Sequence, residues 1–164
     1  MIMPELQRLR ADHGPALLAF ERENRAYFAE SVPDRGDDYF AHFDQRHAEL
    51  LSEQAAGLHH FYLLVDSDGR VQGRVNLVDV ADGAAELGFR IARSAVGRGV
   101  ATSAVRRICD LAARELGLTL LRAGAALDNH ASQAVLTRTG FVRTGQEVTA
   151  DGRPGTTFAK RLEV

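Results

Sequence analysis

The alternation of apolar and polar positions divides the chain into strand-like and helix-like segments. In the segment 100–116, apolar side chains recur at helical spacing from Val100 to Leu116, which predicts an amphipathic helix with one buried stripe. Short apolar runs bounded by turn residues predict strands instead. The predicted strands are 6–10, 61–65, 71–78, 86–91, 119–127, 141–148 and 156–162, and the predicted helices are 15–25, 37–54, 100–116 and 129–139.

These elements follow one another without a repeat, linker or low-complexity segment, so we expect a single domain over residues 1–164. A chain of 164 residues buries roughly 70% of the surface that it exposes when unfolded. Hydrophobic residues make up 45% and charged residues 26% of the sequence, which is ordinary for a globular fold. Turns are predicted at 66–69, 82–83 and 151–152, between consecutive strands.

Charge and cysteine content exclude several classes of protein. A net charge of −2 gives no support to nucleic-acid binding, and no apolar run approaches the length of a membrane-spanning helix. The N-terminus shows no secretory signal. Cys109, the only cysteine, lies on the apolar side of the helix 100–116 and is expected in the core. The six histidines lack zinc-ligand spacing, so no metal site is expected. We therefore expect a cytoplasmic protein without nucleic-acid, membrane or metal partners.

The segment between the strand 86–91 and the helix 100–116 contains the most informative local pattern. A glycine-bearing turn before a helix exposes unpaired backbone N–H groups at the positive end of the helix dipole, where a phosphate or pyrophosphate binds. A P-loop would need a lysine after these glycines, but Lys160 is the only lysine in the chain. A dinucleotide fingerprint would need a third glycine where Thr102 stands. An ordinary glycine turn is the alternative.

Two segments carry a resemblance to a known family. Val96-Gly-Arg-Gly-Val-Ala101 resembles the acetyl-CoA pyrophosphate loop, Gln/Arg-x-x-Gly-x-Gly/Ala, of the GCN5-related N-acetyltransferase (GNAT) superfamily, although Val96 departs from its first position. About 30 residues downstream, Asp128-Asn-His-Ala-Ser-Gln133 and Ala134-Val-Leu-Thr-Arg-Thr-Gly-Phe141 resemble the Asn-x-x-Ser … Val-Leu-x-x-x-Gly-Phe segment of the same superfamily. That segment is typical of the branch that acetylates ribosomal-protein N-termini (RimJ/RimL-type). The resemblance covers residues 60–162 well and the first 60 in layout only.

The resemblance implies an α/β (α+β) GNAT fold, with a mixed, twisted central sheet of about seven strands flanked by about four helices. In this superfamily the sheet opens between its fourth and fifth strands, and the pantetheine arm of the cofactor enters the opening. The aromatic residues of the segment 27–43 would then lie in the acceptor-binding helices, most of them in the core.

Acetyl-CoA is the cosubstrate that the resemblance implies. The pantetheine arm would pair with the strand 86–91, and Asn129 would contact its amides while acting as a helix cap at the same place. Arg93, Arg98 and Arg138 would meet phosphates or be solvated. The cofactor-binding residues implied are Phe89, Arg90, Ile91, Gly97, Arg98, Gly99, Val100, Ala101, Thr102, Asn129 and Ser132.

Three residues are implied in catalysis. Strand alternation places Glu86, Gly88 and Arg90 on one face, and Glu86 is the candidate base for the amine, with a solvated or arginine-paired glutamate as the alternative. The backbone N–H of Arg90 would stabilise the oxyanion. Leu136 stands where the superfamily has its acid tyrosine, so Ser132 is the candidate acid, with helix capping as the alternative.

The implied reaction is acetyl transfer to a primary amine by direct attack in a ternary complex. Within the resemblance, the favoured acceptor is a protein N-terminal α-amine. Two alternatives stay open: a small-molecule amine such as an antibiotic, polyamine or amino acid, and a non-catalytic acyl-CoA-binding domain. A homodimer would be compatible with this family. Acceptor selectivity would lie in the first 60 residues and in the closing hairpin, formed by the predicted strands 141–148 and 156–162, where the resemblance is loosest.

Overall fold

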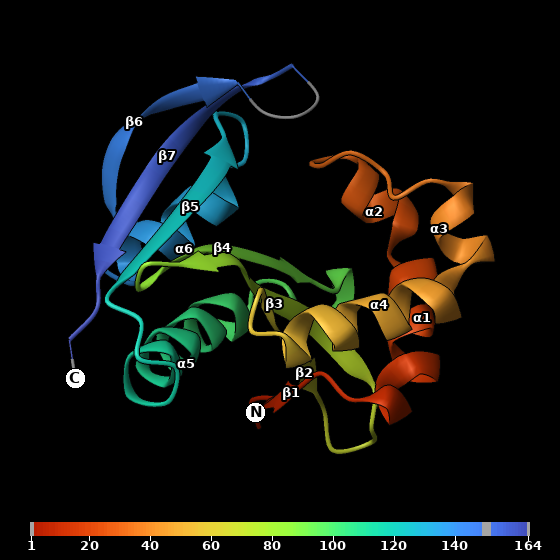
Figure 1. Ribbon diagram of the computed structural model, residues 1–164. Coiled ribbons are helices and arrows are strands. Elements are labelled where there is room, and N and C mark those ends of the chain that lie inside the picture. The colour runs from red at the N-terminus through yellow and green to blue at the C-terminus, as the bar shows by residue number, and fades with distance from the viewer. Residues whose placement is uncertain (1, 149–151, 164) are drawn as a thin grey trace.

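The computed structural model describes residues 2–148 and 152–163, which form one seven-stranded sheet with helices on both faces (Figure 1). The strands are β1 (Glu5–Arg8), β2 (His60–Val65), β3 (Val71–Ala81), β4 (Ala84–Ile91), β5 (Leu120–Ala126), β6 (Val142–Val148) and β7 (Pro154–Arg161). The helices are α1 (Gly14–Glu23), α2 (Arg25–Ala29), α3 (Asp37–Ala41), α4 (Phe43–Ala55), α5 (Val100–Arg114) and α6 (His130–Arg138), with short 3-10 turns η1 (Ala11–His13) and η2 (Arg93–Ala95). The expected mixed α/β fold with seven strands is confirmed.

The sheet opens in its middle, as the family resemblance implied. Its strand order is β1-β2-β3-β4-β5-β7-β6, and among these neighbours only β4 and β5 run parallel. The β4–β5 pairing covers only 84–86 of β4 and 120–122 of β5. Beyond it, β4 stays on β3 while β5 stays on β7 to its end. In Figure 1 the two halves diverge from that point, with β5–β7 on one side and α1–α3 on the other.

The two faces of the β3–β4 pair differ in chemistry. One face is apolar, with Val75, Leu77 and Leu87 buried on the side where α5 packs. The opposite face, toward α1, carries Arg74 and Arg90 instead. This alternation matches the period of two along a strand, and it places Glu86, Gly88 and Arg90 on one face as predicted. The polar face therefore looks toward the helices that precede β2.

One predicted helix is divided in two and one short helix was not predicted, so the described residues form six α-helices. The predicted helix 15–25 ends as α1 at Glu23, and α2 follows after Asn24, whose φ of −104° and ψ of 6° leave the helical region. The Asn24 side chain donates to the carbonyl of Phe20 at 2.9 Å and accepts the backbone N–H of Arg93 at 2.9 Å. The predicted helix 37–54 divides at His42, whose φ is −116°. Local side-chain hydrogen bonds of this kind compete with the helical ladder, and apolar periodicity does not report them.

The core is continuous beneath both halves of the sheet. Cys109 on α5 is 6% exposed and packs in it, as the apolar stripe predicted.

The predicted turn between β6 and β7 includes Asp151, which lies outside the described residues. Within residues 2–148 and 152–163, none of the helices combines the length and the apolar character needed to cross a bilayer.

Candidate active site

Two cavities occupy the opening between β4 and β5. The loop cavity, of about 640 Å³, lies beside the turn before α5 and is lined by residues of α2, β4, α5 and α6. The helix cavity, of about 570 Å³, lies between the α2–α3 connection, the polar face of β3–β4, β5 and the β6–β7 hairpin. Both volumes are in the range of small-molecule sites. Six residues line both cavities: Ser31, Val32, Phe89, Arg90, Asn129 and Ser132. A ligand in one cavity can therefore meet a ligand in the other.

The turn before α5 has the backbone of an anion site. Gly97 and Gly99 have φ values of 77° and 75°, in the left-handed region that glycine adopts without strain. Gly99 is the N-cap of α5, and no side chain caps the helix there. The N–H groups of the first turn of this 15-residue helix therefore face the loop cavity with the positive end of the helix dipole. Among the predicted cofactor residues of this segment, Gly97, Gly99, Val100, Ala101 and Thr102 line the cavity.

The three flanking arginines differ in position. Arg138, on α6, lines the loop cavity. Arg98 is exposed and does not line either cavity. Arg93 lies over the ring of Tyr27, with 5.9 Å between the guanidinium carbon and the ring centroid, and lines neither cavity. The structure thus favours Arg138 over the two loop arginines as a partner for a phosphate.

Strand β4 presents a free edge to the opening. Phe89, Arg90 and Ile91, which are predicted to bind the cofactor, all line the loop cavity. Because pairing with β5 ends at Glu86, alternate backbone N–H and C=O groups of this stretch point into the opening without a strand partner. Such an edge can pair with an extended amide-bearing ligand.

Asn129 and Ser132 lie at the start of α6, on the border of the two cavities. Asn129 is the N-cap of α6, and its side-chain oxygen accepts the backbone N–H of Ser132 at 3.2 Å. Its amide nitrogen remains available as a donor. Because Asn129 supplies the cap, the Ser132 hydroxyl is not needed for capping, and it makes no hydrogen bond to any other described residue. Leu136, in contrast, is 1% exposed in the core and lines neither cavity.

Glu86 lies next to the helix cavity rather than in its lining. Its backbone is paired on both sides, opposite Val78 of β3 and Arg122 of β5. Gly88 and Arg90, on the same face, do line the helix cavity. At about 3.3 Å per residue along a strand, the Cα atoms of Glu86 and Gly88 are roughly 7 Å apart. The Glu86 carboxylate would therefore reach an amine in the cavity only through a bridging water. Within the described part of the chain Glu86 makes no ion pair, so the arginine-paired alternative has no support. A role as base stays a prediction.

Glu147 is a carboxylate in the helix cavity that the sequence reading missed. It lies on β6, in the closing hairpin, and lines the cavity together with Asn129 and Ser132. Its carboxylate occupies the space where a side chain at Gly124 of β5 would begin. A side chain at Gly124 would force this carboxylate to move aside. No local motif marks Glu147, because its place depends on the pairing of β6 with β7 and of β7 with β5.

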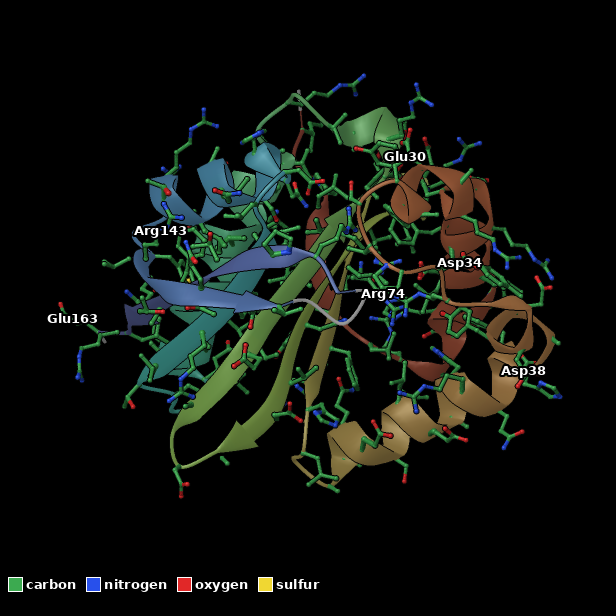
Figure 2. The ribbon with its side chains drawn as sticks, turned by 90° about the horizontal axis from the view of Figure 1, so that it is seen from above. Glu30, Asp34, Asp38, Arg74, Arg143 and Glu163 are labelled. Atoms are coloured by element: carbon green, nitrogen blue, oxygen red, sulfur yellow. The ribbon has the colours of Figure 1, made fainter. Side chains whose placement is uncertain are left out.

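A buried ion cluster behind the helix cavity was also missed. Glu21 of α1 is 1% exposed and accepts hydrogen bonds from Arg35 at 2.6 Å, Arg74 at 3.1 Å and Arg90 at 3.3 Å. Figure 2 shows Arg74 in the middle of the molecule, between the strands and the segment α1–α3. The pKa of Arg90 is lowered to about 10, first by burial and then by the charge of Arg35, with Glu21 opposing both, so its guanidinium stays charged at neutral pH. The residues of this cluster are up to 69 positions apart in the sequence, so the periodicity of apolar residues does not predict the cluster.

Comparison with known proteins gives the family. The acetyltransferase (GNAT) domain model matches residues 5–142. The probable N-acetyltransferase YjcK of Bacillus subtilis is 32% identical over 136 residues, which cover 78% of this chain and 74% of that protein. YdaF of Bacillus subtilis, which carries the name of a ribosomal N-acetyltransferase, is 31% identical over 126 residues, covering 73% of this chain and 64% of its own length.

A solved structure agrees with the fold. The ribosomal-protein-S5-alanine acetyltransferase of Vibrio fischeri superposes with a TM-score of 0.92 at 18% identity, over 99% of this chain and 95% of that one. The superposition includes the first 60 residues, where the sequence resemblance was only one of layout. With an opened sheet, a glycine turn before α5 and a domain match over most of its length, the chain belongs to the acetyltransferase (GNAT) domain family.

Proposed function

We propose that this acetyltransferase transfers the acetyl group of acetyl-CoA to the α-amine of a protein N-terminus, by direct attack in a ternary complex. The observation that carries the proposal is the shared border of the two cavities at Phe89–Arg90 and Asn129–Ser132. Cofactor and acceptor can be bound at the same time, with the thioester and the amine meeting at that border. Holding two reactants in this way removes much of the entropic cost of their encounter.

Acetyl-CoA would occupy the loop cavity. Its pyrophosphate would rest on the N–H groups at the start of α5, after the left-handed Gly97 and Gly99, with Arg138 nearby. Its pantetheine amides would pair with the free edge of β4 and with the amide of Asn129. The thioester would then reach the border, beside Ser132.

The chemistry needs a neutral amine, an oxyanion donor and a proton for the thiolate. The N–H of Arg90, the predicted oxyanion donor, faces β3, because the N–H of Ala92 bonds Gln72 of that strand and residues two apart point the same way. The amine nitrogen attacks the thioester carbonyl carbon, whose oxygen takes up the negative charge and would be stabilised by the N–H of Phe89 or Ile91, which face the opening. When the carbon–sulfur bond breaks, the Ser132 hydroxyl donates its proton to the leaving thiolate and recovers one from solvent. Ser132 suits this role because its hydroxyl is free and lies on the border.

Two carboxylates are proposed to take the proton of the amine. Glu147 lines the helix cavity and can contact an amine directly. Glu86 lies two residues beyond the cavity on β4 and would act through a water molecule. Since an α-amine has a pKa of about 7.7–8.0, compared with about 10.4 for a lysine, a modest base is sufficient for an N-terminus. The name of YdaF and the Asn129–Ser132 segment support the same class of acceptor.

A panel of amines tests this function. The protein is incubated with acetyl-CoA and, in turn, a peptide with a free N-terminus, the same peptide with a blocked N-terminus and an internal lysine, and a small amine. Thiol release and product mass are recorded. We expect one acetyl group on the free N-terminus and none on the blocked peptide. Acetylation of the lysine or of the small amine alone would contradict the acceptor class, and no transfer to any amine would contradict the enzymatic role.

A further inference from the structure

We propose that the acceptor carries a carboxylate a few bonds from the amine that is acetylated, and that Arg35, Arg74 and Arg90 bind this carboxylate. The inference rests on the proposed function, since it assigns the helix cavity to the acceptor. All three arginines line that cavity, whereas Glu21, which holds them, lies behind it. Residues of α1, the α2–α3 connection, β3 and β4 thus combine to build one cationic wall.

The charges of this wall are unbalanced. Three guanidinium groups surround a single carboxylate, so the cluster keeps two formal positive charges. Their side chains are largely withdrawn from water, with exposed fractions of 27% for Arg35, 4% for Arg74 and 22% for Arg90. Removing charge from water is costly unless the charge is paired. An anionic group in the cavity would complete the pairing.

Two buried atoms beside the helix cavity lack a partner in the described part of the chain: a donor that suits a carboxylate, and an acceptor that suits an N–H group of the same ligand. The Nε of Arg74 and the Oδ1 of Asn76 are both buried, and neither has a hydrogen-bond partner among the described residues. Both residues lie on the polar face of β3 and line the helix cavity. Native proteins leave few buried polar atoms without a partner. The free N–H of Arg74 matches a carboxylate oxygen, because guanidinium groups bind carboxylates through adjacent N–H groups.

The opposite wall of the cavity has the complementary chemistry. Glu147 lies there on the hairpin, and Ser132 and Asn129 lie at the border with the loop cavity. An acceptor with both an amine and a carboxylate would place its amine toward Glu147 and the thioester, and its carboxylate toward the arginines. A polyamine, which carries only positive charge, would meet repulsion along the cationic wall.

Two pairs of acceptors test this inference and identify the source of the carboxylate. The first pair consists of amidated pentapeptides with serine at position one and either Asp or Asn at position two. The second consists of free serine and serinamide. Binding is measured by calorimetry in the presence of CoA, and acetyl transfer is measured separately. A charge-assisted hydrogen bond should make the carboxylate member bind roughly tenfold tighter or more, and spermidine should bind least.

Matched variants link the preference to the wall. Arg35→Gln removes the most exposed of the three charges, and we expect the preference for the carboxylate to fall several-fold. Arg35→Lys should retain part of it. Arg114→Gln on α5, which breaks an exposed pair with Asp110 far from the cavity, should leave it unchanged. Arg74 is more deeply buried and is left unchanged. The assay therefore does not depend on whether an Arg74 variant folds.

Each outcome decides the question. A preference shown by the peptide pair supports an acidic N-terminal segment, and a preference shown only by the serine pair supports a free amino acid. Equal affinity within both pairs, or tighter binding of spermidine, would overturn the inference while leaving the acetyltransferase proposal intact. A clear binding preference without any acetyl transfer would support the carboxylate site and count against the proposed reaction.

Discussion

At the scale of single residues, the side chains at the border between the two cavities have separate roles that the sequence alone does not distinguish. Asn129 caps α6 through its oxygen, which leaves its amide nitrogen available as a donor. Ser132 contributes its N–H to that cap, and its hydroxyl makes no hydrogen bond to another described residue. The two roles weighed for Ser132 from the sequence, cap and acid, are therefore distinguishable. The free hydroxyl makes a chemical role testable without a large loss of stability.

Substitution of Ser132 by alanine tests the proposed acid. We expect acetyl transfer to slow by roughly ten- to a hundredfold, since help from one hydroxyl to a thiolate leaving group is worth about 1–3 kcal/mol. The melting temperature should change little, because the cap comes from Asn129. Initial rates and thermal unfolding measured on the same sample decide the matter. A normal rate with a lowered melting temperature would show that Ser132 is structural.

The two glutamates form a second test at this scale. At pH 7 roughly a tenth of an α-amine is neutral, so loss of the base should cost about tenfold in kcat at that pH and less than about twofold at pH 9. We expect Glu147→Gln to show this pattern and Glu86→Gln to show a smaller loss, with acetyl-CoA affinity kept in both. The pH profile of kcat provides the measurement. A Glu86→Gln enzyme with full activity at pH 7 would show that Glu86 is structural, and a pH-independent loss in Glu147→Gln would exclude it as the base.

At the scale of elements, substitution at the start of α5 tests the proposed pyrophosphate site. Gly99→Val places a β-branched residue at a φ of 75°, where only glycine is unstrained, and brings side-chain atoms to the surface where a phosphate would lie. We expect the affinity for acetyl-CoA to fall tenfold or more, which is at least about 1.4 kcal/mol. Isothermal calorimetry measures this directly.

Gly69→Val is the matched control for that experiment. Gly69 also has a left-handed backbone, with a φ of 80° and open space around it, but it lies in the turn between β2 and β3 and lines neither cavity. The Gly69→Val variant should lose about as much stability as Gly99→Val but keep its affinity for acetyl-CoA. Unchanged affinity in Gly99→Val would exclude the pyrophosphate site at α5, and an equal loss in both variants would show that general destabilisation is the cause.

Elements with strong periodicity were predictable, and those shaped by local hydrogen bonds were not. The apolar stripe of α5 and the short runs that form β2–β5 gave elements within a few residues of the observed ones. The breaks at Asn24 and His42 were missed because each depends on the backbone leaving the helical region at a single residue. In the same way, Glu147 and Glu21 acquire their surroundings only when distant segments pair. The residues that line the loop cavity could be predicted because most of them lie in contiguous stretches.

At the scale of the whole molecule, the opened sheet is the feature on which the account depends. Because β4 and β5 pair over a short stretch and then diverge, one cavity lies on each side of the strand edge 89–90, and the two meet there. Strand order cannot be read from strand patterns alone, and it was the resemblance to a family that implied the opening. The cationic wall of the helix cavity, in contrast, belongs to the first 91 residues of this chain and could not be foreseen from that resemblance.

In the proposed reaction, acetyl-CoA and the amine are bound together when the acetyl group moves. Initial rates measured with both substrates varied test it most directly. Transfer within a ternary complex predicts double-reciprocal plots whose lines intersect, and an intact protein whose mass is unchanged after incubation with acetyl-CoA alone. Parallel lines, accompanied by a protein that carries one added acetyl group, would show a covalent intermediate and would contradict the account.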